Sequence, residues 1–187
     1  MIYGMMLQNR MKGQKMDGSI QVYYGNGRGK TTAALGLGIR AAGVGKQVIM
    51  VQFLKKKHSD TLDFLKKLEP ELQIFRFEKA ACGYSDLSPK EKQEQMLNIK
   101  NALGYSRKVL DTGQCDLLIL DEIFGLVDYN IITIEELMDL IAVKKDSMDL
   151  ILTGRNLPDE VREIADCVYS IQREKEKTPE ILAQGNF

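Results

Sequence analysis

Apolar positions recur along the chain with two different periods, and their order predicts an α/β fold. Short apolar runs typical of strands and segments with helical spacing follow one another from residue 19 to residue 172. Because strands and helices alternate, we expect right-handed crossovers and a mostly parallel sheet of about six strands flanked by helices. The predicted strands are 19–24, 47–53, 72–77, 116–122, 150–154 and 167–172, and the predicted helices are 30–42, 61–68, 89–110, 133–144 and 158–166.

Local signals mark several helix ends. Ser88 precedes Pro89, and Glu91 lies three residues after Ser88, which is the pattern of a capping box with proline at the first helical position. Thr133 is placed to cap the helix that follows it. Gly43 is expected to end the first long helix.

The domain organisation is simple. The chain contains no internal repeat, low-complexity segment or linker, so we expect one domain over 19–187 that ends in an irregular C-terminal tail. Residues 1–18 are rich in Met and polar side chains. We interpret them as a flexible N-terminal arm, with a disordered tail as the alternative.

Composition narrows the class of protein. Lys and Arg number 26, as do Asp and Glu, so the net charge is zero and no nucleic-acid partner is expected. The three cysteines are few and far apart, which favours neither a disulfide framework nor a zinc site and fits a reducing cytoplasm. No apolar run approaches the length of a transmembrane helix, so we expect no membrane partner.

The segment 24–32, "YGNGRGKTT", has the composition of a phosphate-binding loop. It follows a predicted strand and opens a predicted helix, where unpaired N–H groups and the helix dipole favour an anion. Its glycines allow the backbone N–H groups to turn around a phosphate, Lys30 can neutralise phosphate charge, and the Thr31 hydroxyl can hold Mg²⁺. A glycine turn between strand and helix would explain the glycines but not the Gly-Lys-Thr that follows. The usual loop also has a glycine where this chain has Tyr24.

Polar residues follow two other buried strands. Asp121 and Glu122 end the strand "LLILDE", at the edge where parallel sheets bind ligands, so they are candidate Mg²⁺ ligands of the Walker B type. Arg155 follows "LILTG", from where it can reach the phosphates. The alternatives are a solvated strand end for the two acids and an ordinary surface arginine.

Four segments together resemble one family, the P-loop type of ATP:cob(I)alamin adenosyltransferase, also called corrinoid adenosyltransferase. They cover roughly residues 19–172 in the order and spacing of the family, whose members also lack the first glycine of the usual loop. The segments are "GNGRGKTTAALG" (25–36), "AAGVGKQVIMVQFLK" (41–55), "LLILDEIFGLVDYNIITIEEL" (117–137) and "LILTGRNLPDEVREIADCVYSI" (150–171).

The resemblance implies a single-domain RecA-like P-loop fold, a homodimer, and transfer of the 5′-deoxyadenosyl group of ATP to the cobalt of a reduced corrinoid, with release of triphosphate. It implies Mg²⁺ or Mn²⁺ as cofactor and a flavoprotein such as flavodoxin as reductant, in adenosylcobalamin synthesis or salvage. It also implies that ATP lies reversed in the loop, which leaves the ribose 5′ carbon open to the incoming cobalt.

The resemblance also assigns roles to single residues. Lys30, Thr31, Glu122 and Arg155 would be the catalytic residues, and Thr31, Asp121 and Glu122 would bind the metal. The expected ATP-binding residues are Gly25, Asn26, Gly27, Arg28, Gly29, Lys30, Thr31, Thr32 and Arg155.

The chain departs from the family on the corrinoid side. Members carry two aromatic residues in the loop that corresponds to "ACGYSD"; here Tyr84 fits the first, and we expect it to contact the corrin ring, but Asp86 stands in place of a Trp. An ordinary half-buried tyrosine is the alternative for Tyr84. The tail also lacks the family's histidine. Two other functions therefore stay open: a P-loop ATPase or kinase that cleaves the β–γ bond, and a non-catalytic ATP- or corrinoid-binding relative.

Overall fold

A computed structural model describes residues 18–55, 65–77 and 87–175. The proposed N-terminal arm, apart from its last residue, lies outside these ranges, as do Tyr84 and the end of the C-terminal tail. The predicted helix over 61–68 falls partly outside them; its described part contains a short 3₁₀ helix, η1 (Lys66–Leu68).

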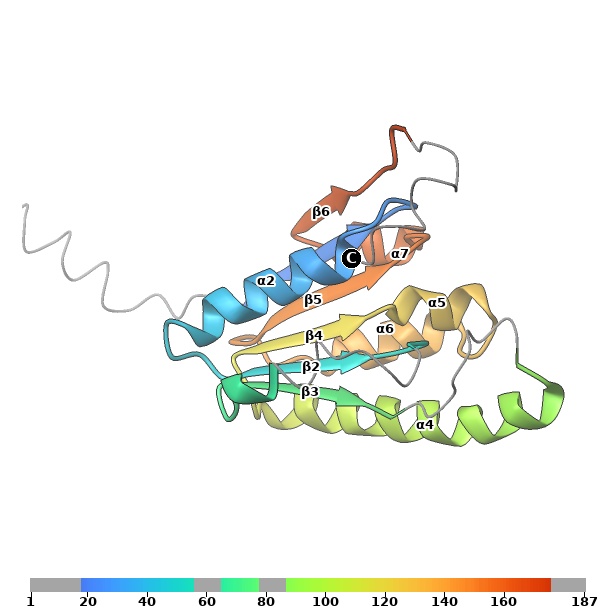
Figure 1. Ribbon diagram of the computed structural model, residues 1–187, viewed down its shortest axis with the longest axis horizontal. Coiled ribbons are helices and arrows are strands. Elements are labelled where there is room, and N and C mark those ends of the chain that lie inside the picture. The colour runs from blue at the N-terminus through green and yellow to red at the C-terminus, as the bar shows by residue number, and fades with distance from the viewer. Residues whose placement is uncertain (1–17, 56–64, 78–86, 176–187) are drawn as a thin grey trace, which may run out of the picture.

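The strands form one sheet of six, in the order β3-β2-β4-β5-β1-β6, and every neighbouring pair is parallel (Figure 1). This confirms the predicted α/β class, and each strand lies within two residues of its predicted bounds. The strands are β1 (Ile20–Tyr24), β2 (Val48–Gln52), β3 (Leu72–Arg76), β4 (Leu117–Asp121), β5 (Asp149–Gly154) and β6 (Cys167–Ser170).

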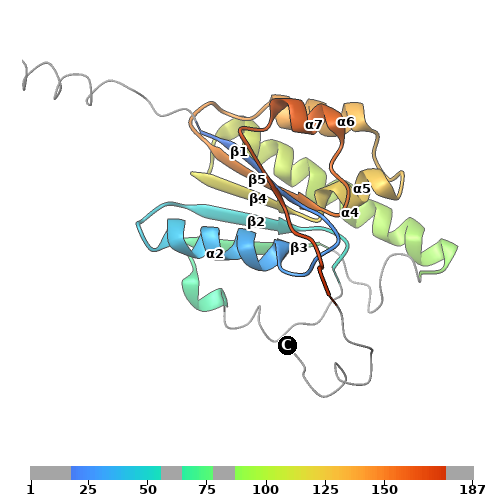
Figure 2. The ribbon, with the colours of Figure 1, turned by 90° about the horizontal axis from the view of Figure 1, so that it is seen from above.

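Helices cover both faces of the sheet: of the α-helices in the described residues, one lies on one face and four lie on the other. Figure 2 shows α2 (Lys30–Ala42) on one face, the same side as the short η1, and the other α-helices on the opposite face. None of the described helices combines the length and apolar character needed to cross a bilayer. The helices of the second face are α4 (Pro89–Thr112), α5 (Ile123–Asp128), α6 (Ile134–Ala142) and α7 (Asp159–Ile164).

Both predicted caps form. The Ser88 side chain accepts the N–H of Glu91 while the Glu91 carboxylate accepts the N–H of Ser88, and Thr133 makes the same reciprocal arrangement with Glu136. In contrast, sequence patterns do not predict α5. This helix has only six residues and begins directly after β4, where Glu122 adopts a positive φ of 62° that turns the chain out of the strand.

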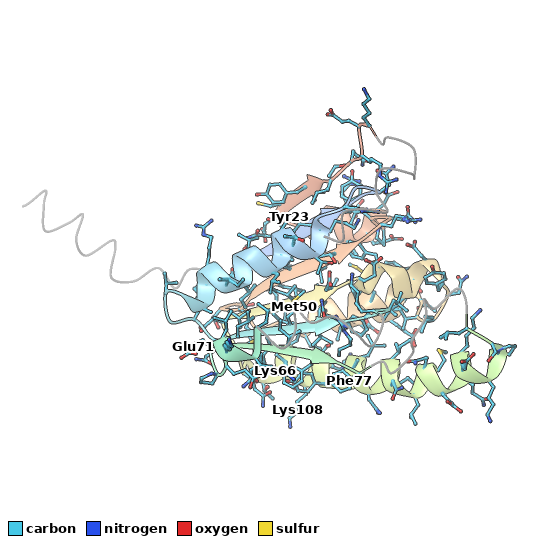
Figure 3. The ribbon with its side chains drawn as sticks, viewed as in Figure 1. Tyr23, Met50, Lys66, Glu71, Phe77 and Lys108 are labelled. Atoms are coloured by element: carbon cyan, nitrogen blue, oxygen red, sulfur yellow. The ribbon has the colours of Figure 1, made fainter. Side chains whose placement is uncertain are left out.

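Each face of the sheet has its own apolar core. Val48, Met50, Ile119 and Ile151 project from neighbouring strands towards Ala34 of α2, with Met50 fully buried between strand and helix layers (Figure 3). The larger core on the other face contains the inward side chains of β4, β5, α4, α5 and α6. Parallel strands buried on both faces are expected to be continuously apolar, which is the pattern of β2 and β4.

The end of β5 depends on a glycine. A Cβ atom at Gly154 would lie 2.4 Å from Cβ and 2.8 Å from Cδ2 of Phe124, a fully buried residue of α5. A side chain at position 154 would therefore push α5 away from the edge of the sheet where Asp121 and Glu122 lie.

We predict that Gly154→Ala destabilises the protein by about 1–3 kcal/mol, because the added methyl group overpacks a buried contact. Urea denaturation followed by circular dichroism measures the change. Gly36→Ala is the matched control: this glycine is exposed within α2 and its Cβ would meet nothing within 4 Å, so the variant should gain up to about 1 kcal/mol in free energy of unfolding. Equal midpoints for Gly154→Ala and the wild type would contradict the packing argument.

Candidate active site

The carboxylate of Asp121 lies at the centre of the site. Asp121 ends β4 and is fully buried. The register of the sheet places Gln52, the last residue of β2, beside it on one side, while Leu120 pairs with Leu152, so that Thr153 of β5 follows on the other. The three side chains therefore form a polar row at the carboxyl ends of β2, β4 and β5.

Every one of these neighbours donates a hydrogen bond to the carboxylate. Thr153 Oγ1 lies 2.7 Å from Oδ1, and Gln52 Nε2 lies 3.0 Å from Oδ2. The Thr31 hydroxyl, in the first turn of α2, lies 2.9 Å from Oδ1 and 3.1 Å from Oδ2. Lys55 forms an ion pair with Oδ2 at 3.5 Å. The predicted pair of Thr31 and Asp121 is thus brought together, because β4 and the phosphate loop end at the same edge of the sheet.

The predicted phosphate loop connects β1 to α2 and is tied to the chain on both sides. The Gly25 N–H donates to the carbonyl of Arg155 at 3.0 Å, and the Gly27 N–H donates to the carbonyl of Ile171 at 2.9 Å. The Asn26 side chain accepts the N–H of Arg173 at 3.2 Å. The polar groups in the first half of the loop are therefore hydrogen-bonded to the segments that follow β5 and β6.

Close backbone approach explains the first two glycines. A Cβ atom at Gly25 would lie 2.3 Å from the carbonyl oxygen of Ile171, and one at Gly27 would lie 2.8 Å from the same atom. Gly29 has open space around it, but its φ of 109° is a conformation that favours glycine. The loop glycines thus serve two purposes, packing at the start of the loop and backbone direction at its end.

The second half of the loop presents the donors that suit a phosphate. Lys30, Thr31 and Thr32 open α2, so their N–H groups have no acceptor within the helix, and the first helical bond runs from Ala33 to Gly29. Unpaired N–H groups and the positive end of the helix dipole together favour an anion. Arg28 precedes them with an exposed side chain.

Lys30 folds back into the loop. Its Nζ donates to the carbonyl oxygens of Gly25 at 2.7 Å and Gly27 at 2.9 Å. Burial lowers the pKa of this ammonium; Glu122 opposes the shift, while Arg155 and Lys55 reinforce it. Three cations and two carboxylates are therefore close enough to act on one another, which leaves a site that gains from a bound polyanion.

The remaining predicted residues reach the same edge of the sheet in different ways. Arg155 follows β5, and its side chain is exposed beside the loop that its own carbonyl anchors. Glu122 donates its N–H to Thr153 Oγ1 at 2.8 Å, and its carboxylate leans over Gly125 of α5. Within the described residues no hydrogen bond joins the Glu122 carboxylate to Thr31 or Asp121.

The donor set at Asp121 fits Mg²⁺. The Thr31 hydroxyl and the Asp121 carboxylate provide converging oxygen atoms, which are the ligands that a hard cation prefers. The described residues contain no cluster of three or more His, Cys, Asp or Glu that would bind a metal ion by itself. Such a site leaves most positions around the cation to phosphate oxygens and water, as is usual for Mg²⁺ with a nucleotide.

Sequence reasoning missed four residues of this network: Gln52, Lys55, Arg76 and Thr153. Gln52 links Asp121 to Arg76: its Nε2 donates to Asp121, and its Oε1 accepts a hydrogen bond from Arg76 Nη2 at 2.6 Å. The available signal was a polar residue at the end of each apolar strand. Only the strand order shows that these ends are neighbours.

The chain matches the family model described as ATP:corrinoid adenosyltransferase BtuR/CobO/CobP over residues 16–184. It is 30% identical over 155 residues to a corrinoid adenosyltransferase of Escherichia coli (strain K12), which covers 83% of this chain and 76% of the relative. The corresponding values for the corrinoid adenosyltransferase CobA of Salmonella typhimurium (strain LT2) are 30% over 159 residues, 85% and 79%.

The fold has a structural counterpart in a KaiC-like protein, PH0186, from Pyrococcus horikoshii OT3. The TM-score is 0.54 at 20% sequence identity, with 87% of this chain and 75% of the other covered. This likeness confirms the RecA-like P-loop fold and concerns the fold alone. Since the family model spans most of the chain, the chain belongs to the ATP:corrinoid adenosyltransferase family.

Proposed function

We propose that this chain transfers the 5′-deoxyadenosyl group of ATP to a reduced corrinoid at the edge of the sheet where Thr31 and Asp121 meet. The observation that carries the proposal is this contact, 2.9 Å between Thr31 Oγ1 and Asp121 Oδ1 at the opening of a helix. ATP:corrinoid adenosyltransferase activity is that of the family. In the reaction cobalt(I) attacks the 5′ carbon, a cobalt–carbon bond forms, and triphosphate leaves with the electron pair of the broken carbon–oxygen bond.

The protein's task in this reaction is alignment and charge stabilisation rather than acid–base chemistry, because cobalt(I) is itself the nucleophile. We assign the triphosphate to the N–H groups from Arg28 to Thr32 and to the side chains of Lys30 and Arg155. Gly25, Asn26 and Gly27 shape this cradle through their bonds to Arg155, Arg173 and Ile171. A cradle confined to the end of the loop is compatible with a reversed ATP whose ribose lies outside it.

Mg²⁺ would be held by Thr31 and Asp121 together with phosphate oxygens, and it would supply positive charge to the departing triphosphate. Glu122 is assigned to the same cation through water. Its backbone is fixed at this edge of the sheet, because its N–H donates to Thr153 Oγ1 at 2.8 Å.

The corrinoid and the protein partners are proposed on the family resemblance. Tyr84 is assigned to the corrin ring. A homodimer, a flavoprotein reductant and a cytoplasmic location are proposed on the same basis. The exposed edge strand β6, on which Tyr169 stacks against Tyr23 at 4.8 Å between ring centroids, leaves apolar surface that a second copy would cover.

We predict that Lys30→Ala loses ATP affinity, because the loop then has no ammonium to neutralise the phosphates. The expected loss is about 2 kcal/mol for a hydrogen bond to a charged group, or roughly thirtyfold in Kd. Isothermal titration calorimetry with Mg·ATP measures it. Lys108→Ala is the control, since Lys108 is exposed on the outer side of α4 (Figure 3). An unchanged affinity of Lys30→Ala for Mg·ATP would contradict the assignment of the phosphates to this loop.

The product distinguishes the reaction from its alternatives. With Mg·ATP and chemically reduced cob(I)alamin under anaerobic conditions, we expect the spectrum of adenosylcobalamin and one triphosphate for each cobalt alkylated. ADP and phosphate would instead indicate a β–γ bond-cleaving ATPase or kinase. Bound ATP with no change in the cobalt spectrum would indicate a non-catalytic relative. Chromatography of the phosphate products, run beside the spectra, separates the three outcomes.

A further inference from the structure

Lys55 lies at the centre of the site although it follows a different strand from the loop and the carboxylates. It comes three residues after the end of β2. Its Nζ lies 3.1 Å from Thr31 Oγ1 and 3.5 Å from Asp121 Oδ2. The ammonium therefore contacts the same two side chains whose oxygen atoms suit Mg²⁺.

The backbone before Lys55 is held in a conformation that directs it there. Leu54 has a φ of 55°, which is uncommon for a residue other than glycine and persists only where the surroundings enforce it. The Leu54 side chain rests on Gly125 of α5, where an added Cβ would approach Leu54 Cδ1 to 2.6 Å. The contact between Leu54 and Gly125 thus fixes the turn that brings Lys55 over the end of β4.

The buried carboxylate of Asp121 requires a cation beside it. The Asp121 carboxylate is fully buried, and a buried charge is strongly unfavourable unless it is paired and hydrogen-bonded. Lys55, whose side chain is 29% exposed, provides the pairing charge. Lys30 does not take this role, because its own ammonium is held by loop carbonyls.

We propose that the Lys55 ammonium occupies the metal position between Thr31 and Asp121 while no metal is bound, and that Mg²⁺ displaces it on binding. The ammonium and a divalent ion would share ligands and repel each other, so they occupy the position in turn. The inference rests on the proposed Mg²⁺ site. Its consequence is that metal alone binds poorly, while metal that arrives with a triphosphate is accepted, since the phosphates then receive the displaced ammonium.

The test measures Mn²⁺ binding to the full chain without nucleotide, by electron paramagnetic resonance of the free ion. Lys55→Met removes the competing charge and should bind Mn²⁺ roughly tenfold more tightly than the wild type, a coupling of ordinary size between two ligands. Lys55→Arg retains the charge and should resemble the wild type. Lys46→Met is the matched control, because Lys46 pairs with Asp149 at 3.1 Å at the opposite edge of the sheet.

A merely structural lysine would not tighten metal binding when removed, so the sign of the change is decisive. Mn²⁺ binding in Lys55→Met that is no tighter than in the wild type, including no measurable binding by either, would overturn the inference. Should Lys55→Met fold poorly, Lys55→Gln gives the same comparison. Asp121→Asn separates the failure of this inference from the failure of the proposed Mg²⁺ site. If Asp121→Asn removes Mn²⁺ binding that Lys55→Met leaves unchanged, Lys55 alone is misassigned, whereas measurable and equal Mn²⁺ binding by all variants contradicts the metal site itself.

Discussion

A single buried carboxylate organises the functional edge of this protein. Asp121 receives hydrogen bonds from Gln52, Thr153 and Thr31 and an ion pair from Lys55, so the ends of β2, β4 and β5 and the start of α2 are joined through one side chain. Because an unpaired charge in this position would be costly, the arrangement also fixes the distances between these elements. The predicted phosphate loop and the candidate metal ligands are thereby held in one arrangement.

The start of the predicted phosphate loop is shaped by its contacts with neighbouring segments of the chain. Tyr24, which stands where other loops have their first glycine, is the last residue of β1, pairs with Gly154 and Ser170, and has the guanidinium of Arg162 5.3 Å from its ring centroid. The loop after Tyr24 is hydrogen-bonded to Arg155 and to the segment after β6, whose close approach requires Gly25 and Gly27.

Much of the fold can be predicted from the sequence because its signals are local. Apolar runs buried on both faces identify the strands, and Ser88 and Thr133 identify two helix starts. Helix α5 escapes this reasoning, since it depends on a positive φ at Glu122 and on a Gly154 that accommodates Phe124. The site was predictable where it uses a motif, as in Lys30 and Asp121. Lys55 and Gln52 were not, because their role arises only from the order and register of the strands.

We propose that Thr31 and Asp121 hold the metal while the triphosphate lies on the N–H groups at the end of the loop and the ribose faces outward. A crystal structure of the protein with Mg²⁺ and ATP, in the absence of corrinoid, tests it most directly. We expect a metal ion bound to Thr31 Oγ1 and to Asp121, directly or through water, with the 5′ carbon open to solvent. A metal ion remote from both residues, or a 5′ carbon turned into the loop, would contradict it.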